Sequence, residues 1–337
     1  MLKNTMIIII ILQEVIVGIN ILKNNIKDHS KPDIFNEKNF VFIISAGRTG
    51  TKFLGDKLSE IIENSYSVHE PDVLNDDFKN IINKIYQFGI YQMIIGKFLN
   101  KTGIRNLSQN YISRKININQ LVTQLINHRE KFYKKINSNL IIESYSGWYG
   151  VIPGIQKLYK YYKIIIIIRD PREWIRSTIN WQNIYGKKDF VQKLSFLKLE
   201  RLNPEMTQDM NYSMDWKEYS KFEKLCWMYN SLYSIMLSEA KNDQNIEVVR
   251  YEDIFNPNGV AFKNMLIFIS EYPNKIYNIN NKNIITDKKI HQTKNSHFPQ
   301  WHSWDDYLAK TLNKHCHELM TKYGYGEESE WIEKINR

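Results

Sequence analysis

The sequence predicts an α/β fold of three layers, in which a parallel sheet is flanked by helices and interrupted by helical insertions. Short apolar runs recur along the chain and alternate with longer stretches of helical periodicity. One run, Lys163–Ile168, contains five consecutive isoleucines, which is typical of a strand covered on both faces. Because helices separate the strands, parallel pairing with right-handed crossovers is expected.

The N-terminus, residues 1–38, is expected to be an apolar segment followed by a polar linker. Residues 6–22 are apolar except for three polar residues: Gln13, Glu14 and Asn20. This length is marginal for a spanning helix, which needs about 20 residues, and a central acid costs about 2.5–3.5 kcal/mol. No small-residue cleavage site follows, so a cleaved signal peptide is not expected. Two alternatives stay open: membrane insertion, or an amphipathic helix that packs on the domain or lies on a membrane.

The main domain is expected to span residues 39–325, with 326–337 as a C-terminal tail. The expected strands are Asn39–Ser45, Tyr66–His69, Asn139–Ile142, Lys163–Ile168 and Ile246–Tyr251. Helical periodicity marks Thr51–Ile62 and the long stretch Tyr219–Ala240. Residues 72–136 are expected to form a helical, tyrosine-rich insertion between strands, in a position to cover a second substrate.

Charge and cysteine content narrow the class of protein. The 337 residues are 43% hydrophobic and 24% charged, which excludes wholesale disorder. A formal charge of +10 suits an anionic partner, such as a phosphorylated cofactor, an acidic saccharide or a membrane surface. No interleaved basic and aromatic motif is present, so nucleic acid is not an expected partner.

Cys226 and Cys316 lie far apart, and the histidines near the C-terminus lack zinc spacing, so neither a disulfide scaffold nor a metal site is expected. A reducing, cytoplasmic compartment fits best, with membrane anchoring through residues 6–22 as the alternative.

The first chemical motif is the loop after the first expected strand, Ser45–Lys52 (SAGRTGTK). A glycine-bearing loop between a strand and a helix aims backbone N–H groups at an anion, and the helix dipole adds to the attraction. The loop also contains Arg48, Lys52 and two threonine hydroxyls, which are expected to surround a phosphate from several sides. The loop is not a Walker A sequence, because it is shorter and Thr precedes Lys. The alternative is an ordinary turn with a threonine helix cap.

The second motif follows the isoleucine strand and runs from Arg169 to Ser177 (RDPREWIRS). It holds three of the ten arginines of the chain, and its Pro171 suits the first turn of a helix. A guanidinium and a hydroxyl together can hold a phosphate. Two alternatives stay open: an Arg–Asp turn that caps a surface helix, or Asp170 as a magnesium ligand at the strand end.

Together the two motifs resemble those of the sulfotransferases that use 3'-phosphoadenylyl sulfate (PAPS), of the carbohydrate-type and bacterial kind. The resemblance rests on Arg48-Thr49-Gly50-Thr51-Lys52 and on Arg169-Asp170-Pro171 with Ser177 eight residues after the arginine. It covers about residues 39–325 and implies a P-loop-type sheet. By this resemblance the loop, from Arg48 through Phe53, would bind the 5'-phosphosulfate. Arg169 and Ser177 would bind the 3'-phosphate.

Three further segments resemble the same family. In His69-Glu70-Pro71, the resemblance makes Glu70 the general base, with His69 as the alternative base. The non-functional alternative is that these residues form a solvated loop. The strand that ends in Tyr251-Glu252-Asp253 would be structural. The segment after Lys294 and Asn295 resembles the basic loop that closes over the nucleotide, although it lacks glycine.

The sequence therefore leads us to expect sulfuryl transfer from PAPS to a hydroxyl or amine acceptor, for example a carbohydrate, without a metal. Glu70, His69, Arg48 and Lys52 would carry the chemistry, and Trp148 and Tyr149 are candidates for the acceptor side. Two alternatives stay open. One is a P-loop kinase or NTPase that binds ATP and magnesium, and the other is a non-catalytic protein that binds a nucleotide or anionic lipid.

Overall fold

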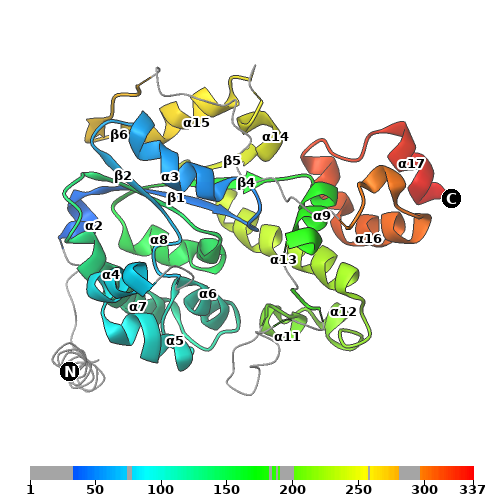
Figure 1. Ribbon diagram of the computed structural model, residues 1–337, viewed down its shortest axis with the longest axis horizontal. Coiled ribbons are helices and arrows are strands. Elements are labelled where there is room, and N and C mark those ends of the chain that lie inside the picture. Colours follow the sequence, from blue (N-terminus) through cyan, green and yellow to red (C-terminus); the bar gives the residue numbers. More distant parts are fainter. Residues whose placement is uncertain are drawn as a thin grey trace.

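The centre of the protein is a sheet of five parallel strands in the order β2-β3-β1-β4-β5 (Figure 1). The strands are β1 (Asn39–Ser45), β2 (Ser65–His69), β3 (Leu140–Ser144), β4 (Tyr161–Ile168) and β5 (Ile246–Arg250). The structure is a computed structural model and describes residues 33–73, 78–181, 184–186, 189, 201–256, 259–280 and 297–337. The expected parallel pairing is confirmed for all four strand pairs.

Helices cover both faces of this sheet, because successive residues of the buried strands point to opposite sides. Phe40, Phe42 and Ile44 of β1 join one apolar cluster, whereas Val41 and Ile43 join another. On one face lie α3 (Thr51–Ile61), α14 (Tyr251–Ile254) and α15 (Ala261–Ser270) (Figure 1). On the other lie α7 (Ile118–Tyr133), α8 (Ile152–Leu158) and α13 (Lys221–Ala240). The expected three-layer α/β class is confirmed.

The described part of the insertion between β2 and β3 is mostly helical. Its elements are α4 (Phe78–Phe88), a π-helical turn (Tyr91–Ile95), α5 (Gly96–Phe98), α6 (Ile104–Ile112) and α7. Asn117 and Gln120 form a capping box that fixes where α7 begins. Between β3 and α8 lies one 3₁₀ turn, Ser146–Gly150, against which α6 packs.

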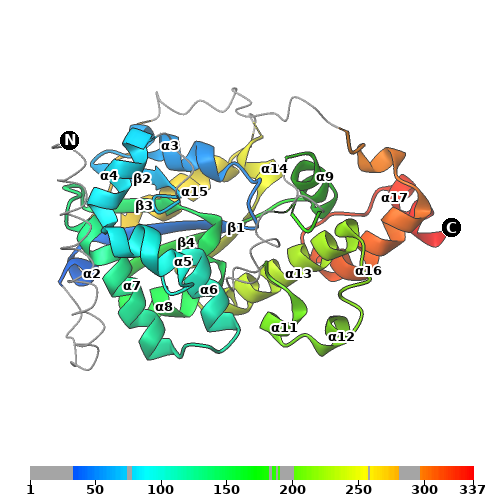
Figure 2. The ribbon, with the colours of Figure 1, turned by 60° about the horizontal axis from the view of Figure 1, so that its bottom comes forward.

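A second group of helices follows β4 and lies at the opposite end of the molecule from α4, α5 and α7 (Figures 1 and 2). It contains α9 (Pro171–Trp181), α11 (Pro204–Thr207), α12 (Met210–Ser213), α16 (Asp306–Lys322) and α17 (Ser329–Asn336). Helix α16 packs along α13, which links this group to the sheet (Figure 2). The smaller elements are β6 (Glu271–Tyr272), β7 (Lys275–Ile276) and the 3₁₀ turn Trp301–Ser303.

Several boundaries differ from the sequence-based expectation, and three of these differences add buried structure. The stretch expected as a linker contains α2 (Ile34–Glu37), whose Phe35 is fully buried. The expected C-terminal tail contains α17, whose Trp331 is 1% exposed and packs against Trp301. Strand β3 continues two residues beyond Ile142, because the polar side chains that extend it find buried partners.

No helix among the described residues is long and apolar enough to cross a membrane. The apolar segment 6–22 lies outside the described residues.

Candidate active site

The loop between β1 and α3 is turned by three residues in the left-handed region: Gly47 (φ 83°), Arg48 (φ 58°) and Gly50 (φ 74°). Only glycine adopts this region without steric cost, so the arginine between the two glycines is strained. The hydroxyl of Ser45 holds the loop, since it accepts hydrogen bonds from the Gly47 N–H (3.0 Å) and from the Thr49 hydroxyl (2.6 Å). The turn is thereby fixed to the end of β1.

The loop delivers the chain to the N-terminus of α3, which no side chain caps. Gly50 occupies the N-cap position, and a Cβ there would lie 2.4 Å from the Phe255 ring. The alternative of a threonine cap is therefore wrong: Thr51 is the first helical residue, and its side chain is buried. The amides of the first turn remain available to an anion, which the helix dipole also attracts.

The second motif, residues 169–177, contacts this loop although more than 120 residues separate the two in the sequence. Arg169 donates from Nη1 to the Arg48 carbonyl oxygen at 2.7 Å, and Arg48 donates from Nε to Ser177 Oγ at 3.1 Å. The Arg48 guanidinium lies 4.5 Å from the ring centre of Trp181, and that of Arg169 lies 4.6 Å from the ring centre of Tyr251. The structure thus brings Arg48, Arg169 and Ser177 together.

The two guanidiniums repel each other. Burial and the neighbouring charge of Arg169 lower the pKa of Arg48, partly offset by Tyr251. Nε of Arg169 is buried without a hydrogen-bond partner, and within the described part of the chain no carboxylate pairs with Arg169. Two adjacent cations beside an uncapped helix form a site that an anion would stabilise.

Asp170, the alternative magnesium ligand, is engaged elsewhere. Its Oδ1 accepts the backbone N–H of Arg172 at 2.8 Å, and its carboxylate pairs with the Arg172 guanidinium at 2.6 Å. Arg172 continues to Glu328, just before α17, with hydrogen bonds of 2.7 and 2.8 Å. Asp170 therefore caps α9 and attaches the C-terminal helix. Among the residues described, no three His, Cys, Asp or Glu side chains gather as a metal site.

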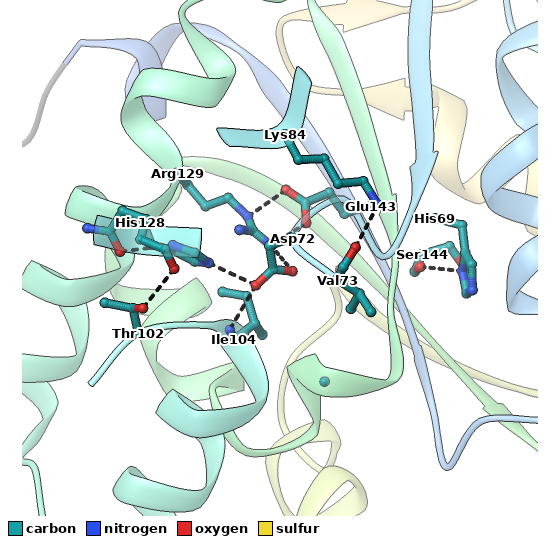
Figure 3. Close-up of polar contacts among 12 residues, drawn as sticks. His69, Asp72, Val73, Lys84, Thr102, Ile104, His128, Arg129, Glu143 and Ser144 are labelled. Carbon is teal, nitrogen blue, oxygen red and sulfur yellow. Dashed lines mark hydrogen bonds and ion pairs between the residues drawn. The ribbon is translucent and has the colours of Figure 1, made fainter. Parts of the chain in front are cut away.

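His69 and Glu70 lie at the end of β2, and the neighbouring Ser144 of β3 orients both. The Ser144 carbonyl oxygen accepts from His69 Nδ1 (2.9 Å; Figure 3) and from the Glu70 N–H (3.2 Å). Because a carbonyl only accepts, Nδ1 carries the proton, and Nε2 presents the lone pair of the neutral ring. Nε2 lies 4.0 Å from Glu70 Oε2. The Ser144 hydroxyl donates to the Thr51 carbonyl oxygen at 2.7 Å and so connects this pair to α3.

Helix α3 also approaches His69 directly. A Cβ on Gly55 would lie 2.7 Å from the His69 backbone nitrogen, so only glycine permits this contact. Burial lowers the pKa of His69, and the nearby charge of Lys52 acts in the same direction. Glu70, the Ser144 carbonyl and Asp56 act against them. The net lowering keeps the ring neutral near pH 7, so that Nε2 is free to accept a proton.

A buried polar network holds the segment that follows Glu70 (Figure 3). Asp72 is fully buried and accepts from His128 Nε2 at 2.9 Å and from the Ile104 N–H at 3.2 Å. Arg129 lies 3.5 Å from Asp72 and makes two 2.9 Å hydrogen bonds to Glu143. Despite the cost of burial, Arg129 and the other cations hold the pKa of Asp72 well below its usual value. The network ties the Glu70 segment to α6, α7 and β3.

The remaining expected site residues are placed as follows. The Phe53 side chain packs on Phe255 with ring centres 5.8 Å apart, so only its backbone amide belongs to the first turn of α3. Trp148 is fully buried and packs on Phe42 and Arg129, so the expectation of an acceptor-side role is wrong for its ring. Tyr149 is 5% exposed.

Lys294 and Asn295 lie outside the described residues. The described chain resumes at His297, whose backbone N–H donates to Asn180 Oδ1 of α9 at 2.9 Å. Asn180 lies three residues after Ser177 on the same helix.

Comparison with solved structures yields sulfotransferases at low similarity. The sulfotransferase from Alicyclobacillus acidocaldarius is 14% identical, with a TM-score of 0.41, over 88% of this chain and 98% of that one. The sulfotransferase domain from the curacin biosynthetic pathway is 11% identical, with a TM-score of 0.37, over 89% and 96%. The sulfotransferase domain of the Synechococcus PCC 7002 olefin synthase is 14% identical, with a TM-score of 0.34, over 72% and 77%. No family model and no curated protein matches the chain. At these values the function has to be argued from the residues themselves.

Proposed function

We propose that the protein transfers a sulfuryl group from PAPS to a hydroxyl or amine acceptor, for example on a carbohydrate. One observation carries the proposal: Arg48 and Arg169 lie side by side at the uncapped start of α3, with Ser177 Oγ 3.1 Å from Arg48 Nε. PAPS carries two separate phosphate groups, and this site offers two separate groups of donors.

The donors fit such a molecule. The buried Nε of Arg169, without a protein partner, and the Ser177 hydroxyl would hold the 3'-phosphate. The loop would hold the 5'-phosphosulfate through Arg48, Thr49, Gly50, Thr51, Lys52 and the Phe53 amide. Lys294 and Asn295 are proposed as further nucleotide ligands.

In the proposed reaction the acceptor oxygen or nitrogen attacks sulfur and loses its proton to a base. The bond between sulfur and the bridging phosphate oxygen breaks, and adenosine 3',5'-bisphosphate leaves. Glu70 is the proposed base. His69 is the alternative, because its Nδ1 is bound to the Ser144 carbonyl oxygen and its Nε2 can accept a proton. Arg48, Lys52 and the first-turn amides stabilise the charge that develops on the leaving phosphate.

The kinase alternative is disfavoured by Asp170. Both its carboxylate oxygens are bound by Arg172, so magnesium would have to displace a buried ion pair. The non-catalytic alternative leaves the oriented His69–Glu70 pair without a role.

A calorimetric titration in EDTA tests the proposal. Adenosine 3',5'-bisphosphate should bind, and more tightly than adenosine 5'-phosphate, because only the former reaches both groups of donors. Tighter binding of ATP with magnesium than of the bisphosphate would favour the kinase alternative and overturn the proposal.

A further inference from the structure

The guanidinium of Arg105 stands out among the cations near the candidate base. Arg105 is the second residue of α6, and its side chain is exposed. Within the described part of the chain it makes no hydrogen bond or ion pair.

Contacts of neighbouring residues place the first turn of α6, which carries Arg105, against the segment that follows Glu70. The N–H of Ile104, the residue before it, donates to Asp72 Oδ2 at 3.2 Å, so the first turn of α6 lies against the segment that follows Glu70. Helix α6 also packs on the turn after β3, where the Ser108 hydroxyl donates to the Gly147 carbonyl oxygen at 2.6 Å. Arg105 therefore projects from a helix that packs both on the segment following Glu70 and on the turn that follows β3.

The electrostatics agree with this placement. Although part of Arg105 is exposed, surrounding protein atoms desolvate its charge and so lower its pKa. Tyr145, Glu70, Tyr149 and Asp72 outweigh this effect and raise the pKa overall. The guanidinium is thus permanently charged and within electrostatic range of Glu70, yet no ion pair between the two forms in the described structure.

Positive charge is in excess around this segment. Four cationic side chains gather there: Lys84, Lys97, Arg105 and Arg129. Arg129 pairs with Glu143, while Lys84 and Lys97 donate to the carbonyl oxygens of Val73 and Asp72. Arg105 is the member of this group that the described protein leaves unused.

We propose that Arg105 binds a negatively charged group of the acceptor, so that the enzyme selects an acidic alcohol or amine over its neutral counterpart. This rests on the proposed sulfuryl transfer. The group is a carboxylate, phosphate ester or sulfate ester, which the planar guanidinium contacts through two parallel N–H groups. With its acidic group on Arg105, the acceptor lies beside Glu70 and His69. The formal charge of +10 favours approach of such a molecule.

The test uses pairs of probes on one scaffold, of which only one member carries a carboxylate, with the protein first saturated with adenosine 3',5'-bisphosphate. One pair is methyl β-glucuronide and methyl β-glucoside, and the other is 4-hydroxyphenylacetate and 4-methylphenol. Affinities are measured by ligand-observed NMR on the parent protein and on Arg105→Gln, Arg105→Lys and Arg114→Gln. Arg114 is an exposed arginine at the other end of α6, so its substitution removes the same charge and serves as the control.

In at least one pair the acid should bind about 10- to 100-fold more tightly than its neutral counterpart, the usual gain from a charged hydrogen bond. Arg105→Gln should abolish this preference, Arg105→Lys should keep part of it, and Arg114→Gln should leave it unchanged. If the bisphosphate binds but neither acid is preferred, or the preference survives in Arg105→Gln, the inference is wrong and the proposed function stands. If the bisphosphate fails to bind, the proposed function falls and the inference falls with it.

Discussion

Substituting Arg169 should specifically remove the preference for a nucleotide that carries a 3'-phosphate. Nη1 of Arg169 is bound to the Arg48 carbonyl oxygen at 2.7 Å, the guanidinium is held against the Tyr251 ring, and the buried Nε has no protein partner. The unused donor is the one we assign to the 3'-phosphate. A hydrogen bond to a charged group contributes about 1.5–3 kcal/mol, which corresponds to about 10- to 150-fold in Kd.

The assay is a titration of the parent protein and of Arg169→Gln with adenosine 3',5'-bisphosphate and with adenosine 5'-phosphate. Arg169→Gln also removes the contact to the loop, which weakens both nucleotides alike, so the ratio of the two Kd values isolates the 3'-phosphate. The ratio should fall by about 10- to 150-fold in Arg169→Gln. It should stay constant in the exposed control Arg114→Gln. A ratio that Arg169→Gln leaves intact would refute the assignment.

Three further predictions concern the loop, the base and the buried network. Lys52→Ala, at an exposed position, should lower turnover and nucleotide affinity together without lowering Tm, and full activity of this variant would contradict its role in the loop. Glu70→Gln should reduce turnover by about 10²- to 10⁴-fold while nucleotide binding survives. His69→Asn should reduce turnover less, and the opposite order of the two losses would make His69 the base. Burial lowers the pKa of His128 from 6.5 to about 4, so the unfolded chain binds this proton first and the free energy of unfolding should fall as the pH drops from 6.5 to 4. In denaturant titrations of His128→Gln, the free energy of unfolding should fall less steeply as the pH drops. Part of the fall should remain, because burial also lowers the pKa of His315 to about 4. An unchanged slope would contradict the neutral state of His128.

The sheet and the two anion-binding motifs follow from the sequence because local patterns encode them. The apolar runs of β1 and β4 specify buried strands, and the residue after each strand begins a motif. Parallel strands place their carboxyl ends at one edge of the sheet, which is why the two motifs meet there. Arg169 Nη1 donates to the Arg48 carbonyl oxygen at 2.7 Å.

The rest of the site depends on partners that sequence spacing does not reveal. Asp170 has the same local sequence whether it binds magnesium or an arginine, and only the fold brings Glu328 to complete the clamp around Arg172. Asp72, His128 and Arg129 come from two segments of the helical insertion, and each resembles a solvated polar residue in the sequence. Ser144 was missed for the same reason, although a serine at the end of a buried strand was a signal.

The sequence also explains only some of the glycines. Gly50 was recognised as part of the loop, but the reason that Gly55 is glycine is the His69 backbone, which lies 2.7 Å from the position of its missing Cβ. Such a contact between a helix and the neighbouring strand requires the assembled structure. The same holds for α17, whose Trp331 is buried by packing against Trp301.

The central claim, sulfuryl transfer, is tested most directly by following the transferred group. The protein is incubated with a small-molecule cell extract and either sulfur-labelled PAPS or ATP–magnesium labelled in its γ-phosphate, with Lys52→Ala as the paired variant. We predict that label from PAPS appears in acceptor molecules, that EDTA does not prevent it, and that Lys52→Ala sharply reduces it. Label entering acceptors from ATP and not from PAPS would contradict the account.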